Sequence, residues 1–367
     1  MVSGVAARDA AAIAVGSYDV HVGTGLLDRA GDIIRSVAPA HRYAIISDAN
    51  VAPRYAARVR ESVGAARSEL FAIPSGESHK TREQWAQLTD ALLAAGFGRD
   101  TTILALGGGV IGDLAGFVAA TYMRGIPFVQ LPTSLLAMID ASVGGKTGVD
   151  TASGKNLVGA FHRPRAVIAD PAVLATLPVN HLRAGLAEAV KHGAIADAAY
   201  YASVDRSLSA LRDDPTGAAM RPLIVRSIEI KASIVLQDER ESGIRRNLNF
   251  GHTIGHAIES ESGYRLLHGE AIAIGMVLEA RLGERLGVTA EGTAKQLRDT
   301  LTRAELPVTI PKDLDPQRIL SAARGDKKTR EGVTEYALLA EIGRATAGLR
   351  APDEVVLELL TQSGNAQ

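Results

Sequence analysis

A short β-branched run followed by a glycine-rich turn constrains the fold of this chain more than any other feature. Residues 101–106 form a strand pattern, and Gly107, Gly109 and Gly112 follow it in a G-x-G-x-x-G spacing that leads into an apolar helical segment. Glycines let backbone N–H groups approach a phosphate, and the positive end of a helix favours its charge. The pattern predicts a strand–turn–helix unit that binds a nucleotide. The alternative is a tight structural turn.

Other elements of the first half support a parallel sheet. Residues 43–48 and 127–131 are typical of further strands, and residues 84–95 carry the apolar spacing of a helix. Short strands that alternate with helices indicate parallel strands joined by crossover helices. We therefore predict a Rossmann-like α/β nucleotide-binding domain over residues 1–178.

The second half has a different pattern. Apolar residues recur with helical spacing in four segments, and a strand pattern returns only at residues 336–342. The helical segments are residues 182–196, 222–237, 252–260 and 270–286. We predict a mainly α-helical metal- and substrate-binding domain over residues 179–367, with the cleft between the domains as the expected site.

Composition narrows the possible partners and location. The 367 residues carry a formal net charge of −1, so we expect no nucleic-acid or membrane partner. The chain has no cysteine, which excludes disulfides and thiol catalysis and is compatible with the cytoplasm. The N-terminus has no secretory layout, and no apolar stretch has the length of a membrane span.

Histidines are the strongest chemical signal in the second half. His252 and His256 are four residues apart, so they share one face of a helix, and His268 follows nearby. Two imidazoles and a carboxylate can form an open catalytic zinc site. The segment is similar to the His-Glu-x-x-His signature of zinc proteases, but Thr253 replaces its glutamate, so the sequence does not favour a zinc protease. The alternative is that these are ordinary helix-face or N-cap histidines.

Glu188 is the carboxylate that would complete such a site. It lies among apolar residues, where an unpaired carboxylate would be costly, and Lys191 and His192 share its helix face. It is therefore either an ion-paired helix residue or the oxygen ligand of the metal.

Acidic and basic residues near the glycine turn could contact the nucleotide. The acidic residue expected about 20 positions after the turn, for the ribose hydroxyls, is missing. Asp48, at the end of the earlier strand, is a substitute, and Glu77 and Lys80 could also line the nucleotide.

Several cations lie in stretches that are otherwise apolar or glycine-rich. A lysine beside glycines can reach an anion without obstruction, so these cations together favour a polyanionic substrate. They are Arg124, Lys146, Lys155, Lys191, Lys231 and Arg245.

The motifs described above, taken in their order along the chain, resemble those of the dehydroquinate synthase family, the sugar-phosphate cyclases of the shikimate pathway. The resemblance runs from about residue 43 to residue 342 and depends on eight ordered motifs. They are residues 107–113, 122–125, 143–147, 154–161, 185–188, 249–252, 268–271 and 326–328.

The resemblance implies a ligand and cofactor set. Zn²⁺, which Co²⁺ could replace, would be held by Glu188, His252 and His268. His256 would be a base that lies beside these ligands or contacts the substrate. NAD would be contacted by Asp48, Glu77, Lys80, Gly108, Gly109, Asp113, Thr133, Ser134, Lys155 and Thr176. The substrate would meet Arg124, Asp140, Lys146, Asn156, Lys191, Lys231, Arg245, Asn249, His256 and Lys327, with Lys328 an alternative to Lys327.

The resemblance also implies the reaction. Members convert 3-deoxy-arabino-heptulosonate 7-phosphate into 3-dehydroquinate and phosphate. Transient oxidation by NAD precedes phosphate elimination, re-reduction, ring opening and an intramolecular aldol closure. We expect a small-molecule sugar-phosphate substrate and a homodimer in the cytoplasm.

Two alternative activities remain open. One is a related cyclase, acting on an amino analogue or on sedoheptulose phosphate. The other is a metal-dependent polyol dehydrogenase, which would release NADH and would not need the cation set.

Overall fold

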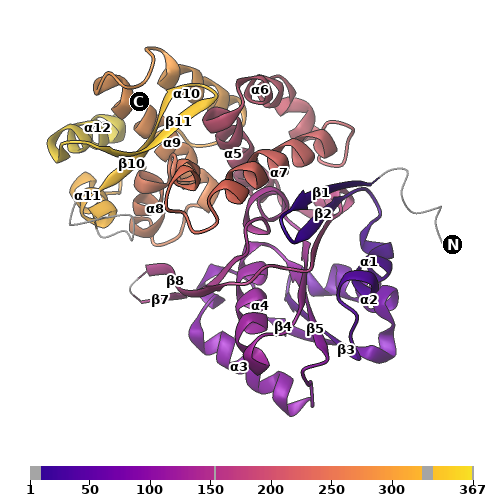
Figure 1. The fold of residues 1–367 in the computed structure, drawn as a ribbon. Helices are drawn as coiled ribbons and strands as arrows, with labels where there is room; N and C mark the ends of the chain where they lie inside the picture. Colours follow the sequence, from indigo (N-terminus) through magenta and orange to yellow (C-terminus); the bar gives the residue numbers. More distant parts are fainter. Residues whose placement is uncertain (1–9, 153, 325–333, 366–367) are drawn as a thin grey trace. The chain divides into compact units, whose positions relative to one another are not determined.

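The computed structural model describes residues 10–152, 154–324 and 334–365 (Figure 1). The chain divides into two compact units. The first comprises Met1–Leu177 and Met220–Ala232, and the second comprises Pro178–Ala219 and Ser233–Gln367. Helix α7 (Met220–Gln237) therefore belongs mainly to the first unit.

The first unit is built on a seven-stranded sheet in the order β1-β2-β9-β6-β5-β3-β4. Its pairs are parallel except β1 with β2, as the alternation of strands and helices predicts. The three strands predicted from sequence are confirmed as β3, β5 and β6. The strands are β1 (Ala11–Val15), β2 (Tyr18–Val22), β3 (Arg42–Asp48), β4 (Ser68–Ile73), β5 (Thr101–Gly107), β6 (Phe128–Pro132) and β9 (Ala166–Ala169).

Helices lie on both faces of this sheet, with α1 and α2 on one side and α3 and α4 on the other (Figure 1). Successive side chains of β3 point to opposite faces of the sheet. Ala44 and Ile46 belong to the core beneath α3 and α4, and the buried Ile45 points to the other face. Burial on both faces explains why these strands read as continuous apolar runs. The helices are α1 (Ala30–Val37), α2 (Ala52–Val63), α3 (Arg82–Ala94) and α4 (Gly109–Thr121).

A separate hairpin of β7 (Lys146–Thr151) and β8 (Gly154–Phe161) completes the first unit. The strands pair antiparallel, with Lys146 opposite Phe161. Most of β8 is exposed, so the hairpin carries little of the buried-face alternation that would predict it.

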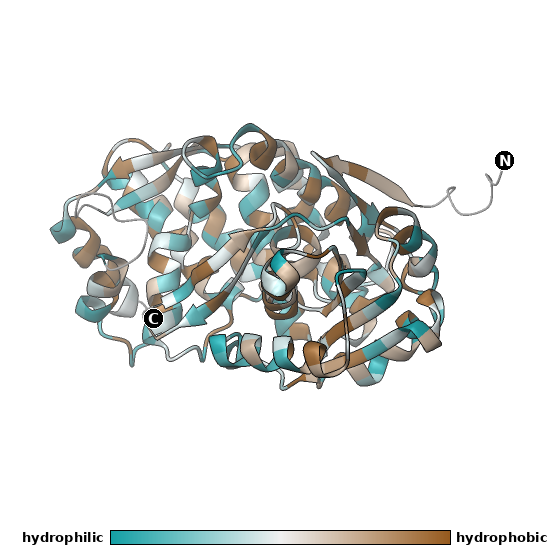
Figure 2. Ribbon diagram, turned by 60° about the horizontal axis from the view of Figure 1, so that its bottom comes forward, coloured by the Kyte–Doolittle hydropathy of each residue, from teal (hydrophilic) through white to brown (hydrophobic). Residues whose placement is uncertain are grey.

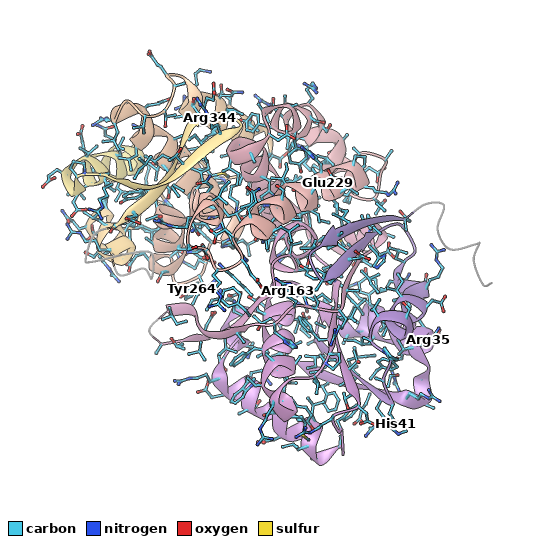
Figure 3. The ribbon with its side chains drawn as sticks, viewed as in Figure 1. Arg35, His41, Arg163, Glu229, Tyr264 and Arg344 are labelled. Carbon is cyan, nitrogen blue, oxygen red and sulfur yellow. The ribbon has the colours of Figure 1, made fainter. Side chains whose placement is uncertain are left out.

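The second unit is mainly helical, as predicted. Three of the predicted helical segments are confirmed as α5, α8 and α9, and the fourth is α7. The predicted strand near residue 336 is β10, which pairs antiparallel with β11; Arg344, labelled in Figure 3, begins β11. The elements are α5 (Val179–Ala196), α6 (Ala198–Asp213), α8 (His252–Glu261), α9 (His268–Arg285), α10 (Thr293–Arg303), α11 (Pro316–Arg324), β10 (Glu335–Glu341), β11 (Arg344–Arg350) and α12 (Asp353–Asn365).

Apolar faces of α8, α9, α11, α12 and β10 form the core of this unit. Brown and teal stretches alternate along the helices in Figure 2, as expected for elements with one buried face. Two glycines of α9 allow close packing. A Cβ at Gly275 would lie 2.0 Å from the Gly251 carbonyl oxygen, and one at Gly269 would lie 2.1 Å from that of Ala184. The backbones of α8 and α5 thus pack directly against the backbone of α9, with no side chain between them at these two glycines.

Among the residues that the structure describes, no helix combines the length and apolar character needed to cross a membrane.

Candidate functional site

The glycine turn joins β5 to α4 in the way the sequence predicts. Strand β5 ends at Gly107, Gly108 is the N-cap, and α4 starts at Gly109. A Cβ at Gly107 would lie 2.6 Å from the Ile111 side chain, and one at Gly112 would lie 2.7 Å from Gln130 Oε1. These contacts exclude a larger residue without rearrangement. The N-cap Gly108 supplies no side-chain hydrogen bond to the first turn of α4, so this helix N-terminus is bare and suited to an anion.

The buried Lys80 lies at the centre of the charged residues predicted beside this turn. Lys80 is 4% exposed, and its Nζ lies 2.9 Å from Glu77, 3.4 Å from Asp113 and 3.6 Å from Asp150. Lys155 also reaches Glu77, at 3.2 Å. The structure thus brings together four of the residues expected to contact NAD.

The pKa values of this network follow from burial and charge. Burial opposes ionisation of Glu77, but Lys80 and Lys155 outweigh it and lower its pKa to about 2. Burial raises the pKa of Asp113 to about 6, although Lys80 opposes the shift and Glu77 adds to it. The pKa of Lys80 is raised despite its burial, because its neighbours are carboxylates. A pKa displaced by burial and a specific partner is typical of functional sites.

Asp48 ends β3 at the same sheet edge as the glycine turn, because β3 and β5 are parallel neighbours. Its Oδ1 accepts the N–H groups of Asn50 at 2.8 Å and Val51 at 3.0 Å, which fixes the carboxylate at the start of α2. This location fits the predicted contact with a ribose.

Two further predicted nucleotide contacts follow β6. The Thr133 N–H donates to the Gly107 carbonyl at 2.9 Å, and a Cβ at Gly108 would be 3.5 Å from Ser134 Oγ. Both residues therefore adjoin the glycine turn. Thr176 is held by the hydroxyl of Tyr55 on α2, at 2.6 Å.

Two residues of the predicted substrate set form a pair within the first unit. Lys231 Nζ lies 2.7 Å from Asp140 Oδ1 and donates to the Asp140 carbonyl at 2.6 Å. Lys231 is buried on α7, and Asp140 lies in the short π-helix Ala137–Ala141. The pairing fixes a lysine that would otherwise have many rotamers.

The remaining predicted residues of the first unit occupy more exposed positions. Lys146 begins β7, and Asn156 lies on β8 with φ of 53°, its N–H held by Asp150 at 2.9 Å. Arg124 is exposed in the turn Tyr122–Arg124, also with a positive φ of 67°.

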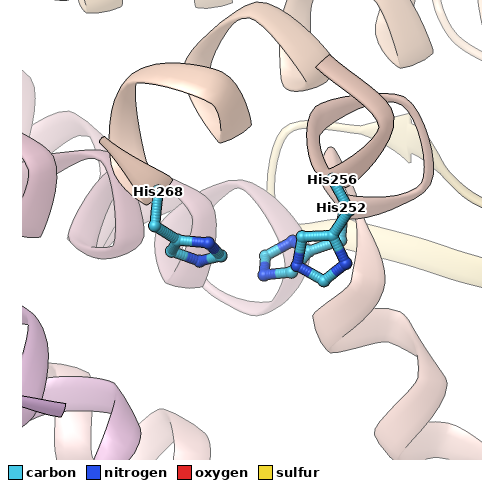
Figure 4. Close-up of side chains that lie close together, drawn as sticks. All are labelled: His252, His256 and His268. Carbon is cyan, nitrogen blue, oxygen red and sulfur yellow. The ribbon is translucent and has the colours of Figure 1, made fainter. Parts of the chain in front are cut away.

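The three histidines of the second unit come together, as Figure 4 shows. His252 opens α8, His256 lies one turn later, and His268 opens α9. Their ring centroids are 5.0 to 5.6 Å apart, and each ring offers a nitrogen within 4.8 Å of the others.

Glu188, fully buried on α5, faces two of these rings. Its Oε1 lies 3.6 Å from His252 Nε2 and 3.4 Å from His268 Nε2. Two imidazole nitrogens and one carboxylate oxygen, from three helices, thus converge on one point. This is a donor set that zinc accepts. The predicted ligands are therefore adjacent, and Lys191 also pairs with Glu188.

The outer nitrogens of the two rings have partners of different kinds. His252 Nδ1 lies 3.1 Å from the Phe250 carbonyl oxygen, and His268 Nδ1 lies 3.5 Å from the carboxylate of Glu259. Burial lowers the pKa of His268, but Glu188 and Glu259 outweigh it and raise the pKa to about 9. The two carboxylates on either side of the His268 ring make this site attractive to a cation.

A tight loop presents Arg245 and Asn249 of the predicted substrate set. The Asp238 carboxylate accepts the N–H groups of Ser242, Gly243 and Arg245, at 2.9, 2.6 and 3.1 Å. These donors lower the pKa of Asp238 to about 2, against burial. Asn249 Nδ2 donates to Glu241 at 2.7 Å.

The structure adds residues that the sequence did not single out. Asp150 joins the Lys80 network, and Glu259 joins the histidines. A signal for Glu259 existed, because it follows His256 by three residues on the same helix face. Asp150 had no comparable signal. Lys327 and Lys328 lie outside the described residues.

A parallel sheet with a bare glycine turn in one unit, and a carboxylate with imidazoles in the other, define a class of nucleotide- and metal-dependent enzymes. Comparison with known families narrows the class. Residues 70–184 match the family profile "3-dehydroquinate synthase N-terminal", and residues 185–329 match "3-dehydroquinate synthase C-terminal". The chain belongs to the 3-dehydroquinate synthase family, as the motifs predict.

Individual relatives agree with this membership. The chain is 45% identical to a 3-dehydroquinate synthase of Nitrosomonas europaea, over 94% of each chain. Among solved structures, it is similar to the 2-epi-5-epi-valiolone synthase ValA from Streptomyces hygroscopicus subsp. jinggangensis with NAD⁺ and Zn²⁺ bound. The TM-score is 0.86 with 30% identity, over 96% of this chain and 98% of that one.

A second solved structure is a 2-deoxy-scyllo-inosose synthase complexed with carbaglucose-6-phosphate, NAD⁺ and Co²⁺. The TM-score is again 0.86, with 27% identity, over 96% of this chain and all of that one. The predicted fold class is confirmed by these neighbours.

Proposed function

We propose that this chain is a 3-dehydroquinate synthase, which converts 3-deoxy-arabino-heptulosonate 7-phosphate into 3-dehydroquinate and phosphate. One observation carries the proposal: 45% identity to a curated enzyme of that name extends over 94% of both chains. Identity to the two cyclases with other products is only 27% and 30%. This difference favours 3-dehydroquinate synthase over a related cyclase.

We assign the metal to Glu188, His252 and His268. The convergence of both Nε2 atoms on Glu188 Oε1 supports this set, and the imidazole and carboxylate donors suit Zn²⁺ or Co²⁺. When bound, the ion would supply Lewis acidity to substrate hydroxyl groups. His256, beside this set, would exchange a proton with the substrate.

We assign NAD to the glycine turn and the residues around it. The bare N-terminus of α4 would receive the pyrophosphate, and Asp48 would accept ribose hydroxyls. When bound, the cofactor would supply a reversible hydride acceptor.

The cations would hold the substrate by its carboxylate and phosphate. Lys231 is oriented by Asp140, and Arg245 is fixed by the Asp238 loop. Lys146, Lys191, Asn156 and Asn249 would belong to the same set, together with Arg124 and Lys327. Fixed positive groups at two ends of an anion orient the carbons between them, which raises the rate of an intramolecular reaction.

A coupled assay tests the proposal. Purified enzyme with zinc, trace NAD and heptulosonate phosphate should release one phosphate per substrate and form 3-dehydroquinate without net NADH absorbance. Turnover of sedoheptulose 7-phosphate instead would favour the related cyclase. Stoichiometric NADH from simple polyols, without phosphate release, would favour a dehydrogenase.

Two variants test the residues assigned to the metal and to the substrate. His252→Ala should lose metal and activity while it stays folded, and zinc retained at full stoichiometry would contradict the assigned ligands. Lys146→Ala should keep its zinc but lose about a hundredfold or more in rate, the size of one preorganised electrostatic donor. Unchanged turnover in Lys146→Ala would remove this lysine from the substrate set.

We also propose a homodimer located in the cytoplasm. The biosynthetic role of the family supports this location, and light scattering of the purified protein tests the subunit number.

A further inference from the structure

Glu259 is a buried carboxylate beside the proposed metal ligands but is not one of them. It lies on α8, one turn beyond His256, and is 4% exposed. Burying a carboxylate is costly unless a partner stabilises it. Its Oε2 lies 3.5 Å from Nδ1 of His268, on the opposite side of that ring from Glu188.

The two proposed imidazole ligands are oriented in the same way. In both rings Nε2 faces Glu188 Oε1, at 3.6 Å for His252 and 3.4 Å for His268. In both rings Nδ1 faces an oxygen acceptor, which is a backbone carbonyl for His252 and a carboxylate for His268. An acceptor at Nδ1 selects the tautomer that carries its proton there, and so leaves the lone pair on Nε2.

The acceptors differ in strength, and this difference singles out His268. A carboxylate attracts the Nδ1 proton more strongly than a neutral carbonyl does, so it makes Nε2 more basic. His268 also lacks the support that His252 receives from its own neighbouring backbone, because its Nδ1 partner comes from a different helix.

We infer that Glu259 is a positioning residue for the metal site: it accepts the Nδ1 proton of His268 and thereby fixes this imidazole with Nε2 towards the ion. The inference depends on the metal ligands assigned under the proposed function. It predicts that loss of the Glu259 charge weakens metal binding even though every ligand remains.

Glu259→Gln tests the inference by direct metal binding. The variant keeps the side-chain size and removes the charge. We expect its dissociation constant for Zn²⁺, measured by competition with a chelator, to rise by about 10- to 100-fold, the range for loss of such a partner. The visible spectrum of the Co²⁺-loaded variant should also shift, because a less basic imidazole changes the ligand field.

Glu261→Gln is the matched control. Glu261 lies on the same helix, but its carboxylate pairs with Arg318 at 2.8 Å. Its loss should leave metal affinity unchanged within about twofold, well below the range for Glu259.

Each outcome has a distinct meaning. Wild-type metal affinity and an unchanged Co²⁺ spectrum in folded Glu259→Gln would overturn the inference and leave the metal site intact. Full zinc retention by His252→Ala would instead overturn the ligand assignment in the proposed function.

A measurement on the wild-type protein covers the case in which Glu259→Gln does not fold. In zinc-loaded protein with ¹⁵N-labelled histidine, NMR should find the His268 proton on Nδ1 and the metal on Nε2. The opposite tautomer would overturn the inference without any variant.

Discussion

At the scale of single residues, folding changes the pKa of the Asp113 carboxyl group. Burial raises its pKa to about 6, against the pull of Lys80. Between its ordinary value, near 4, and 6, the folded protein binds a proton that the unfolded chain has released. The free energy of unfolding therefore decreases through this window as pH rises, as far as this group contributes.

Asp113→Asn should remove that contribution. The amide does not ionise, so the variant should gain stability relative to wild type as pH rises from 4 to 7, by up to about 3 kcal/mol for two pKa units. Denaturant unfolding of the cofactor-free proteins across this range measures the difference. A difference independent of pH would show that Asp113 titrates normally.

Asp48 should determine which dinucleotide the protein prefers. Its carboxylate would repel the 2′-phosphate of NADP, so wild type should bind NAD more tightly. Asp48→Asn keeps an acceptor oxygen for the turn at Asn50 and Val51 and removes the charge. The variant should bind NADP at least about tenfold more tightly, which corresponds to about 1.4 kcal/mol. Equal activation of wild type by both cofactors would contradict this role.

At the scale of elements, the contact between α8 and α9 depends on glycine. A methyl group at Gly275 would meet the Gly251 carbonyl oxygen at 2.0 Å and the Gly255 nitrogen at 2.8 Å. Helix α8 would have to move, and His252 begins it. Gly275→Ala should therefore cost about 1–3 kcal/mol of stability and also weaken zinc binding.

Gly364→Ala provides the control, measured by the same denaturant unfolding. Gly364 lies on α12, and a Cβ there would have no neighbour within 4 Å. Alanine favours a helix over glycine, so this variant should gain up to about 1 kcal/mol. A Gly275→Ala protein as stable as wild type would mean that the helices can separate at no cost.

Periodicity decides which elements are predictable from the sequence. Strand β5, a continuous apolar run, and helix α8, whose apolar residues recur at helical spacing, carry strong patterns and were predicted. Hairpin β7–β8 was not predicted, because its second strand is largely exposed and has no buried alternation. Helix α6 also escaped prediction, although Asp197 caps its first turn by accepting the Tyr200 N–H at 2.9 Å.

The residues of the site were also predictable only in part. Motifs predict which residues have chemical roles, and their residue types suggest which ions they bind. Partners such as Asp150 and Glu259 are fixed by contacts between segments separated along the chain, and the residue pattern does not contain those contacts.

At the scale of the whole molecule, the residues assigned to the two cofactors belong to different units. The described residues assigned to NAD all lie in Met1–Leu177, and the three metal ligands all lie in the second unit. Ligand binding stabilises the part of a protein that holds the ligand. Zinc should therefore slow amide hydrogen exchange in α5, α8 and α9, and NAD should slow it at the β5–α4 turn.

Hydrogen exchange followed by mass spectrometry measures both effects in one preparation. Zinc that protects no peptide of α5, α8 or α9 would contradict the assigned ligands, and NAD without effect at the glycine turn would contradict the nucleotide site.

The path of the chain also limits how relatives of this protein can be recombined. Met220–Ala232 belongs to the first unit, although the chain visits the second unit before it and after it. A chimera joined once at residue 177 would take Asp140 from one parent and its partner Lys231 from the other. Exchange of an intact unit therefore requires three junctions, near residues 177, 219 and 232. Gene shuffling with a single crossover separates residues that must fit each other.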